Sequence, residues 1–164
     1  MANAYIALGS NLNHPTQQVL AAIKAIAKLP DCQLIKQSSL YETAPVDCPE
    51  QNSTPAPNFI NAVLQVTTQL SPHALLAALH AIENAAGRER PYVNAPRVLD
   101  CDLLLYDDRL INDGRLSLPH PRMHQRGFVL LPLFEIDPHL SMPNHGKIAT
   151  LIAQQSFTGI KRLP

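Results

Sequence analysis

Several features typical of other protein classes are scarce in this sequence of 164 residues. It has no tryptophan, and aromatic residues make up 5% of the chain. Its 13 basic and 13 acidic residues cancel, which leaves a formal net charge of zero. Nucleic-acid-binding sheets usually display stacking aromatic and basic residues. The composition therefore argues against nucleic acid as a partner, and equally against binding to a charged membrane surface.

Cysteines are few and long apolar runs are missing. Cys32, Cys48 and Cys101 form no Cys-x-x-Cys pair, which predicts reduced thiols in a cytoplasmic protein. No apolar run approaches the roughly 20 residues that span a membrane. The first residues do not combine a basic and an apolar region, so we expect no signal peptide. One core suffices for a chain of this length, and we expect a single domain over 1–164.

The chemistry of the chain is concentrated in the segment 96–106. Asp100 and Asp102 stand among leucines that mark a buried strand, and residues two apart in a strand share a face. Cys101 between them faces the other way. Paired carboxylates repel each other, and Mg²⁺ compensates such a pair well. Arg97 offers a planar fork of hydrogen-bond donors for phosphate. The two carboxylates and this arginine together indicate phosphoryl-type transfer. The alternative is that the two aspartates lie at a solvated strand end.

Other polar residues leave two interpretations open. Asn61 stands inside the apolar run 59–66, where it either caps a strand end or binds the edge of a heterocycle. The segment 9–11 predicts a tight turn after the first strand, either against a ligand or another backbone or simply into a helix. His120 lies between two prolines and is either structural or functional. Glu83 falls in the last turn of a helix, where its charge opposes the helix dipole.

Hydrophobic periodicity predicts the order strand, helix, strand, strand, helix, strand, followed by a C-terminal extension. This order indicates an α+β fold: a ferredoxin-like antiparallel sheet with helices packed on both faces, in three α/β/α layers. A long proline-containing loop over 47–58 is typical of a lid or a binding loop. The tail after residue 154 gives no prediction. The expected strands are 4–8, 33–37, 59–66 and about 99–105, and the expected helices are 15–30, 71–86, 126–134 and 148–154.

Seven short motifs follow one another along the chain, at residues 5–12, 39–43, 58–63, 87–90, 96–102, 119–123 and 128–133. Each is weak alone, but the ordered set covers the chain from about Ala4 to Pro138. It resembles the 6-hydroxymethyl-7,8-dihydropterin pyrophosphokinase family of folate biosynthesis. The resemblance implies an ATP-dependent enzyme that moves pyrophosphate from ATP to the pterin hydroxymethyl group and releases AMP. It also implies two Mg²⁺ ions, with ATP as co-substrate.

The same resemblance implies roles for individual residues. The catalytic set is Arg88, Arg97, Asp100 and Asp102, of which Asp100 and Asp102 would hold the metal. The pterin set is Thr43, Ala44, Pro45, Val46, Phe59, Asn61 and Phe128. The ATP set is Glu83, Arg88, Arg90, Arg97, Arg115, Ser117, His120 and Arg126. Two lids are implied at 47–58 and 89–95. The chain departs from the family pattern where Val93 replaces a common arginine, Val98 a threonine and Cys101 a leucine.

Two alternatives compete with this interpretation. One is a non-catalytic ferredoxin-like module that binds a small ligand or RNA. The other is a degenerate paralogue that binds pterin without turnover. The main interpretation predicts ATP and a reduced pterin as small-molecule partners, no nucleic acid, no membrane and a monomer.

Overall fold

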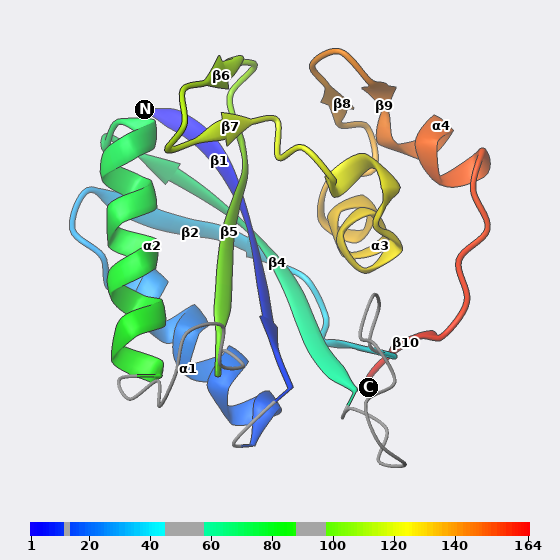
Figure 1. The fold of residues 1–164 in the computed structure, drawn as a ribbon, viewed down its shortest axis with the longest axis horizontal. Helices are drawn as coiled ribbons and strands as arrows, with labels where there is room; N and C mark the ends of the chain where they lie inside the picture. The colour runs from blue at the N-terminus through cyan, green and yellow to red at the C-terminus, as the bar shows by residue number, and fades with distance from the viewer. Residues whose placement is uncertain (12–13, 45–57, 88–97) are drawn as a thin grey trace.

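The computed structural model describes residues 1–11, 14–44, 58–87 and 98–164. A six-stranded antiparallel sheet forms its centre, in the order β10-β3-β4-β1-β5, with β2 also paired to β4 (Figure 1). Its strands are β1 (Ala2–Ser10), β2 (Cys32–Gln37), β3 (Tyr41–Thr43), β4 (Phe59–Thr68), β5 (Asp100–Tyr106) and β10 (Ile160–Arg162). The helices are α1 (Pro15–Ala27), α2 (Pro72–Ala86), the 3₁₀ helix η1 (Met123–Gln125), α3 (Gly127–Ile136) and α4 (Ile148–Ala153). Two small hairpins pair β6 (Ile111–Asn112) with β7 (Ser117–Leu118), and β8 (Ser141–Met142) with β9 (Gly146–Lys147).

Helices lie against both faces of the sheet, as the sequence predicts. Ala4 and Ile6 of β1 face the core that α1 and α2 cover, whereas Tyr5 between them faces the core of α3 and α4. Figure 1 shows α1 and α2 on one side of the sheet and α3 and α4 on the other. A strand buried on both faces is apolar along its whole length. This explains why apolar residues follow one another without alternation over 4–8 of β1 and over 103–106 of β5.

The predicted helices form where the sequence places them. Ser71 caps α2, because its Oγ accepts a hydrogen bond from the backbone N–H of Ala74 at 3.2 Å. Pro72 follows in the first turn, where a missing N–H costs nothing. The last predicted helix is confirmed as α4, and the helix predicted over 126–134 is confirmed as α3. Capping and apolar periodicity therefore determine the helices locally.

One turn prediction is wrong. Gly9 and Ser10 belong to β1 rather than to a turn, and Gly9 pairs with Asn61 of β4. A Cβ atom at Gly9 would lie 2.9 Å from Oδ1 of Asn61, closer than real Cβ contacts come. The glycine therefore makes room for the amide of the neighbouring strand instead of bending the chain.

Strands β3 and β10 were not predicted. Each has three residues, too few for an alternating pattern, and they pair with each other at the edge of the sheet. Among the described residues, Cys32 and Cys101 are free thiols, whereas Cys48 lies outside them. No helix in the described ranges has both the length and the hydropathy to cross a membrane.

Candidate active site

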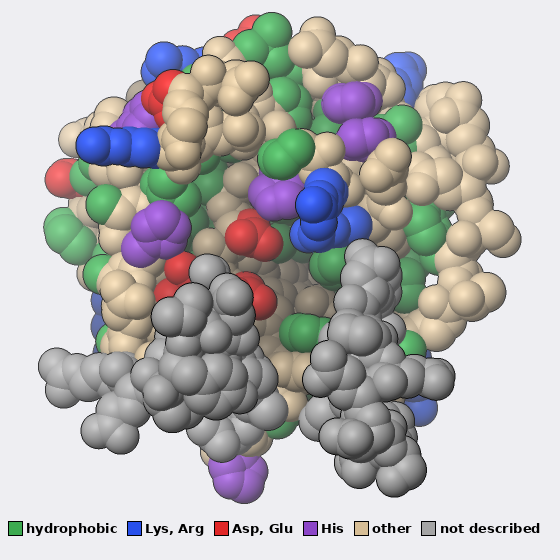
Figure 2. All heavy atoms as spheres, in the orientation of Figure 1, with side chains coloured by type: hydrophobic (Ala, Val, Ile, Leu, Met, Phe, Trp, Pro, Cys, Tyr) green, Lys and Arg blue, Asp and Glu red, His purple; other side chains and the backbone are tan. Residues whose placement is uncertain are grey.

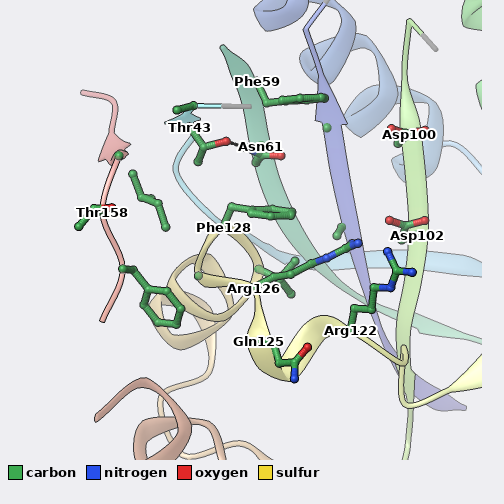
Figure 3. Close-up of a pocket in the computed structure, with 18 of the residues that line it drawn as sticks. Thr43, Phe59, Asn61, Asp100, Asp102, Arg122, Gln125, Arg126, Phe128 and Thr158 are labelled. Atoms are coloured by element: carbon green, nitrogen blue, oxygen red, sulfur yellow. Dashed lines mark hydrogen bonds between the residues drawn. The ribbon is translucent and has the colours of Figure 1, made fainter. Parts of the chain in front are cut away.

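A cavity of about 510 Å³ opens between the sheet, the start of α3 and the C-terminal segment (Figure 3). Its volume lies in the range of small-molecule sites. We call it the larger cavity. Its lining comes from segments distant in sequence: Ala7, Leu8, Gly9, Thr43, Ala44, Phe59, Asn61, Asp100, Asp102, Arg122, Gln125, Arg126, Gly127, Phe128, Val129, Ser156, Phe157, Thr158, Gly159 and Ile160.

One part of the larger cavity combines two aromatic rings with a buried amide. In Figure 3 the Phe59 and Phe128 rings lie on either side of the Asn61 side chain. Asn61 is 6% exposed, and its Nδ2 donates a hydrogen bond to Oγ1 of Thr43 at 2.9 Å. It lies within the paired part of β4, opposite both Gly9 and Tyr41. The alternative that Asn61 caps a strand end is therefore wrong.

The acidic part of the larger cavity lies on β5. Asp100 and Asp102 are half-buried and both line the cavity, whereas Cys101 between them is 2% exposed on the opposite face. This confirms the predicted alternation. Burial raises the pKa of the Cys101 thiol, and the nearby carboxylates of Glu83, Asp102 and Asp100 raise it further. Cys101 is therefore a protonated core thiol.

Glu83 is tied to the same strand. Its Oε2 accepts a hydrogen bond from the backbone N–H of Cys101 at 3.0 Å. This bond fastens the last turn of α2 to β5. It accounts for a carboxylate at the helix end where the dipole disfavours negative charge.

Cationic side chains face the carboxylates from the residues that directly precede η1 and α3. In Figure 3 Arg122 and Arg126 extend toward β5 and Asp102. The guanidinium carbon of Arg126 lies 5.5 Å from the centre of the Phe128 ring, a cation–π distance. Burial lowers the pKa of His120; Asp102 opposes this, and Arg126 and Arg122 add to it. Nδ1 of His120 accepts a hydrogen bond from the backbone N–H of Arg122 at 3.3 Å.

A smaller cavity of about 250 Å³ lies beside the first, between α2, β5 and the segment that follows β6. Asp102 lines both cavities. Figure 2 shows acidic side chains gathered in the middle of the face that it presents, with histidine and Lys or Arg side chains beside them. The lining is Leu76, His80, Glu83, Cys101, Asp102, Leu103, Arg115, Leu116, Ser117, His120 and Pro121.

The predicted residues separate between the two cavities. Thr43, Ala44, Phe59, Asn61 and Phe128, predicted to bind pterin, line the larger cavity. Glu83, Arg115, Ser117 and His120, predicted to bind ATP, line the smaller one, whereas Arg126 lines the larger. Pro45, Val46, Arg88, Arg90 and Arg97 lie outside the described residues, as do Val93 and both predicted lids apart from Asn58.

Part of the lining was not predicted from the sequence. Arg122 lies within the motif 119–123, so its place in that motif was a signal that could have marked it. Gln125 and the C-terminal residues 156–160 carry no such signal, because no motif or periodicity distinguishes them.

Comparisons with known proteins identify the family. The model of the family described as "7,8-dihydro-6-hydroxymethylpterin-pyrophosphokinase (HPPK)" matches residues 5–138. The chain belongs to this family. It is 46% identical to the 2-amino-4-hydroxy-6-hydroxymethyldihydropteridine pyrophosphokinase of Haemophilus influenzae, over 94% of this chain and 93% of that one. It is 42% identical to the protein of the same name in Pseudomonas aeruginosa, over 98% and 96% of the two chains.

A solved structure supports the fold independently. A Plasmodium falciparum HPPK-DHPS structure superposes with a TM-score of 0.76 at 16% identity, over 98% of this chain. The chain spans 48% of that longer protein, so the likeness concerns one part of it and shows the fold alone. Family membership confirms the predicted activity, the ATP-dependent transfer of pyrophosphate to hydroxymethyldihydropterin, and does not favour a non-catalytic module.

Proposed function

We propose that the larger cavity binds the reduced pterin, that the smaller cavity binds ATP, and that transfer occurs where they meet. One observation carries this division of the site. Asp102 lines both cavities, and the residues predicted for pterin line the larger one. The reacting hydroxyl and the β-phosphorus must meet at one point, and the shared wall provides that point.

The larger cavity suits a flat heterocycle. The Phe59 and Phe128 rings offer faces for stacking. Asn61 is held by Thr43, and a side-chain amide presents donors and an acceptor to a ring edge. These features select an aromatic ring system with polar edges, which a pterin is.

The carboxylates of β5 suit Mg²⁺. Asp100 and Asp102 point to one face of the strand and supply hard oxygen ligands. The described residues contain no group of three or more metal-binding side chains, which matches an ion that takes one or two carboxylates and completes its shell with phosphate oxygens and water. We propose that Asp100 and Asp102 hold two Mg²⁺ ions. Mg²⁺ held there would supply positive charge to the phosphates and would ease deprotonation of the attacking hydroxyl.

The remaining residues position the reactants. Arg122 and Arg126 face the shared wall and would hold phosphate oxygens by charge-assisted hydrogen bonds. Because Nδ1 of His120 accepts from Arg122, the neutral ring carries its proton on Nε2, which would donate to a phosphate. The reaction leaves little covalent chemistry to the protein, so alignment and charge neutralisation supply the rate. Enclosure between the two walls would exclude water and prevent hydrolysis of ATP.

Several broader assignments belong to the same proposal. The strand order around β2, β4, β1 and β5 supports a ferredoxin-like sheet, to which β3 and β10 add a further edge. We propose a single domain that acts as a monomer in the cytoplasm, with ATP and the reduced pterin as its partners.

An AMP-release assay tests the proposed function. The protein is incubated with ATP and Mg²⁺, with and without 6-hydroxymethyl-7,8-dihydropterin, and AMP and the pterin diphosphate are quantified. We expect equal amounts of both products, and neither when the pterin or Mg²⁺ is left out. Pterin binding without AMP formation would identify a degenerate paralogue instead.

A further inference from the structure

The segment that follows α4 runs along the larger cavity and ends as β10. We call residues 156–162 the C-terminal strap. Its residues from Ser156 to Ile160 line the cavity. The strap lies beyond residue 138, where the match to the family model ends. The cavity therefore has one wall that the family motifs do not supply.

The strap lies directly on the backbone at the start of α3. A Cβ atom at Gly127 would lie 2.6 Å from the Phe157 ring and 2.7 Å from Cδ1 of Ile160. Such contacts are possible only because residue 127 has no side chain. Gly127 stands between Arg126 and Phe128, both of which line the cavity. The Phe157 ring therefore packs against the backbone that leads into Phe128.

The strap also holds β3. Ile160 pairs with Thr43, and the backbone N–H of Ala44 donates to the carbonyl oxygen of Gly159 at 3.2 Å. Without β10, the three residues of β3 would form an unprotected sheet edge, which is a weak arrangement. Thr43 in turn accepts the hydrogen bond of Asn61, so the strap reaches the pterin-binding amide through one intermediate residue.

Arg162 secures the strap outside the cavity. Its Nε donates to Oγ of Ser39 at 3.0 Å, and its Nη2 lies 3.3 Å from Oε2 of Glu135 on α3. Glu135 also accepts from the hydroxyl of Tyr41 on β3 at 2.8 Å. Arg162 therefore joins β10, β3 and α3 at one carboxylate.

We propose that the C-terminal strap is a positioning element that sets the affinity for pterin, by holding Thr43 on one side of the cavity and Phe128 on the other. This inference rests on the proposed function of the larger cavity. It assigns no chemical step to the strap. It predicts that changes in the strap weaken pterin binding while nucleotide binding in the smaller cavity stays the same.

The first test removes the ring of Phe157. Titration calorimetry measures binding of a non-hydrolysable ATP analogue with Mg²⁺, and then of 6-hydroxymethyl-7,8-dihydropterin to the saturated complex. We expect Phe157→Ala to raise the pterin Kd by about tenfold, the scale of a lost aromatic contact, with an unchanged Kd for the analogue. Phe157→Leu should restore most of the affinity. Phe134→Ala is the matched control, because Phe134 lies on α3, is 41% exposed and does not line the cavity.

The second test changes a residue outside the cavity. It keeps the inference testable even if Phe157→Ala fails to fold. Arg162→Ala should raise the pterin Kd by about threefold, the scale of a partly exposed ion pair. Lys161→Ala, at a residue of the same strand that is also exposed, should have no effect. Thermal unfolding of each variant shows that it is folded.

Three results would overturn the inference. An unchanged pterin Kd in both Phe157→Ala and Arg162→Ala would do so. Equal weakening of pterin and nucleotide would also do so, since it would show a general loss of structure. Failure of the unmodified protein to bind pterin would overturn the proposed function itself, and the strap inference with it.

Discussion

The two cavities differ in how far apart in sequence their walls lie. The smaller cavity is built from residues between Leu76 and Pro121, on α2, β5 and the segment that connects them to η1. The larger cavity takes its lining from Ala7 at one end of the chain to Ile160 at the other. The described residues that were predicted to bind ATP line the smaller cavity, with the exception of Arg126. The smaller cavity therefore draws on one stretch of the chain, whereas the larger one depends on the assembly of the whole sheet.

The largest effect is expected where the cavities meet. Asp102→Asn should lower turnover by about a hundredfold or more, because a metal ligand supplies several kcal/mol of charge stabilisation. The fold should persist, since the change removes one of two repelling charges. Steady-state AMP release measures the effect, with Asp108→Asn in the exposed turn after β5 as the control. Near-normal turnover at low Mg²⁺ would refute the metal assignment.

A substitution in the larger cavity should separate the two ligands. Asn61→Ala should weaken pterin binding by about 1–3 kcal/mol, the scale for an unpaired buried polar group. Nucleotide binding should change little, because Asn61 does not line the smaller cavity. Titration with each ligand checks this. Equal loss of both affinities would mean that Asn61 supports the fold rather than binds the pterin.

The converse substitution lies in the smaller cavity. Arg115→Ala should weaken binding of the ATP analogue by about 1 kcal/mol, because an exposed charge contributes less than a buried one. Pterin binding should stay the same. Arg109→Ala, at an exposed basic residue outside both cavities, is the control. If Arg115→Ala affected pterin instead, the division between the cavities would be wrong.

The smallest effect concerns pH and a pair of stacked histidines outside both cavities. The His124 and His145 rings stack with centroids 4.1 Å apart, and Nδ1 of His124 is buried without a hydrogen-bond partner among the described residues. Burial and His145 lower the pKa of His124 below its usual 6.5. The unfolded chain therefore binds this proton more readily, so the free energy of unfolding should fall as the pH drops below about 6.5.

Denaturant unfolding at pH 7.5 and 5.5 measures this pH effect. His124→Gln should reduce the difference between the two free energies of unfolding, whereas His139→Gln at an exposed histidine should not. An unchanged pH dependence in His124→Gln would show that the stacked pair does not titrate with folding.

The sequence anticipated the elements whose signals are local. The cap at Ser71, the apolar face of α1 and the alternation of Asp100 and Asp102 about Cys101 all depend on residues within a few positions of each other. Gly9 shows the limit of such reasoning. The residues around Gly9 suggest a turn. A glycine is needed there because the Asn61 amide lies against it, on a strand that begins 50 residues later. No local pattern in the sequence spans that separation.

The sequence by itself determined the helices, four strands of the central sheet, the paired carboxylates and the family, because each depends on periodicity, capping or ordered short motifs. The tertiary structure alone decided that Asp102 lies in both cavities, that Arg122 faces β5, and that the last residues form a wall of the larger cavity. Strand pairing between β3 and β10 joins residues more than 100 positions apart. Such contacts form only when helices pack on both faces of the sheet and bring distant segments together. That packing exists only in the folded chain.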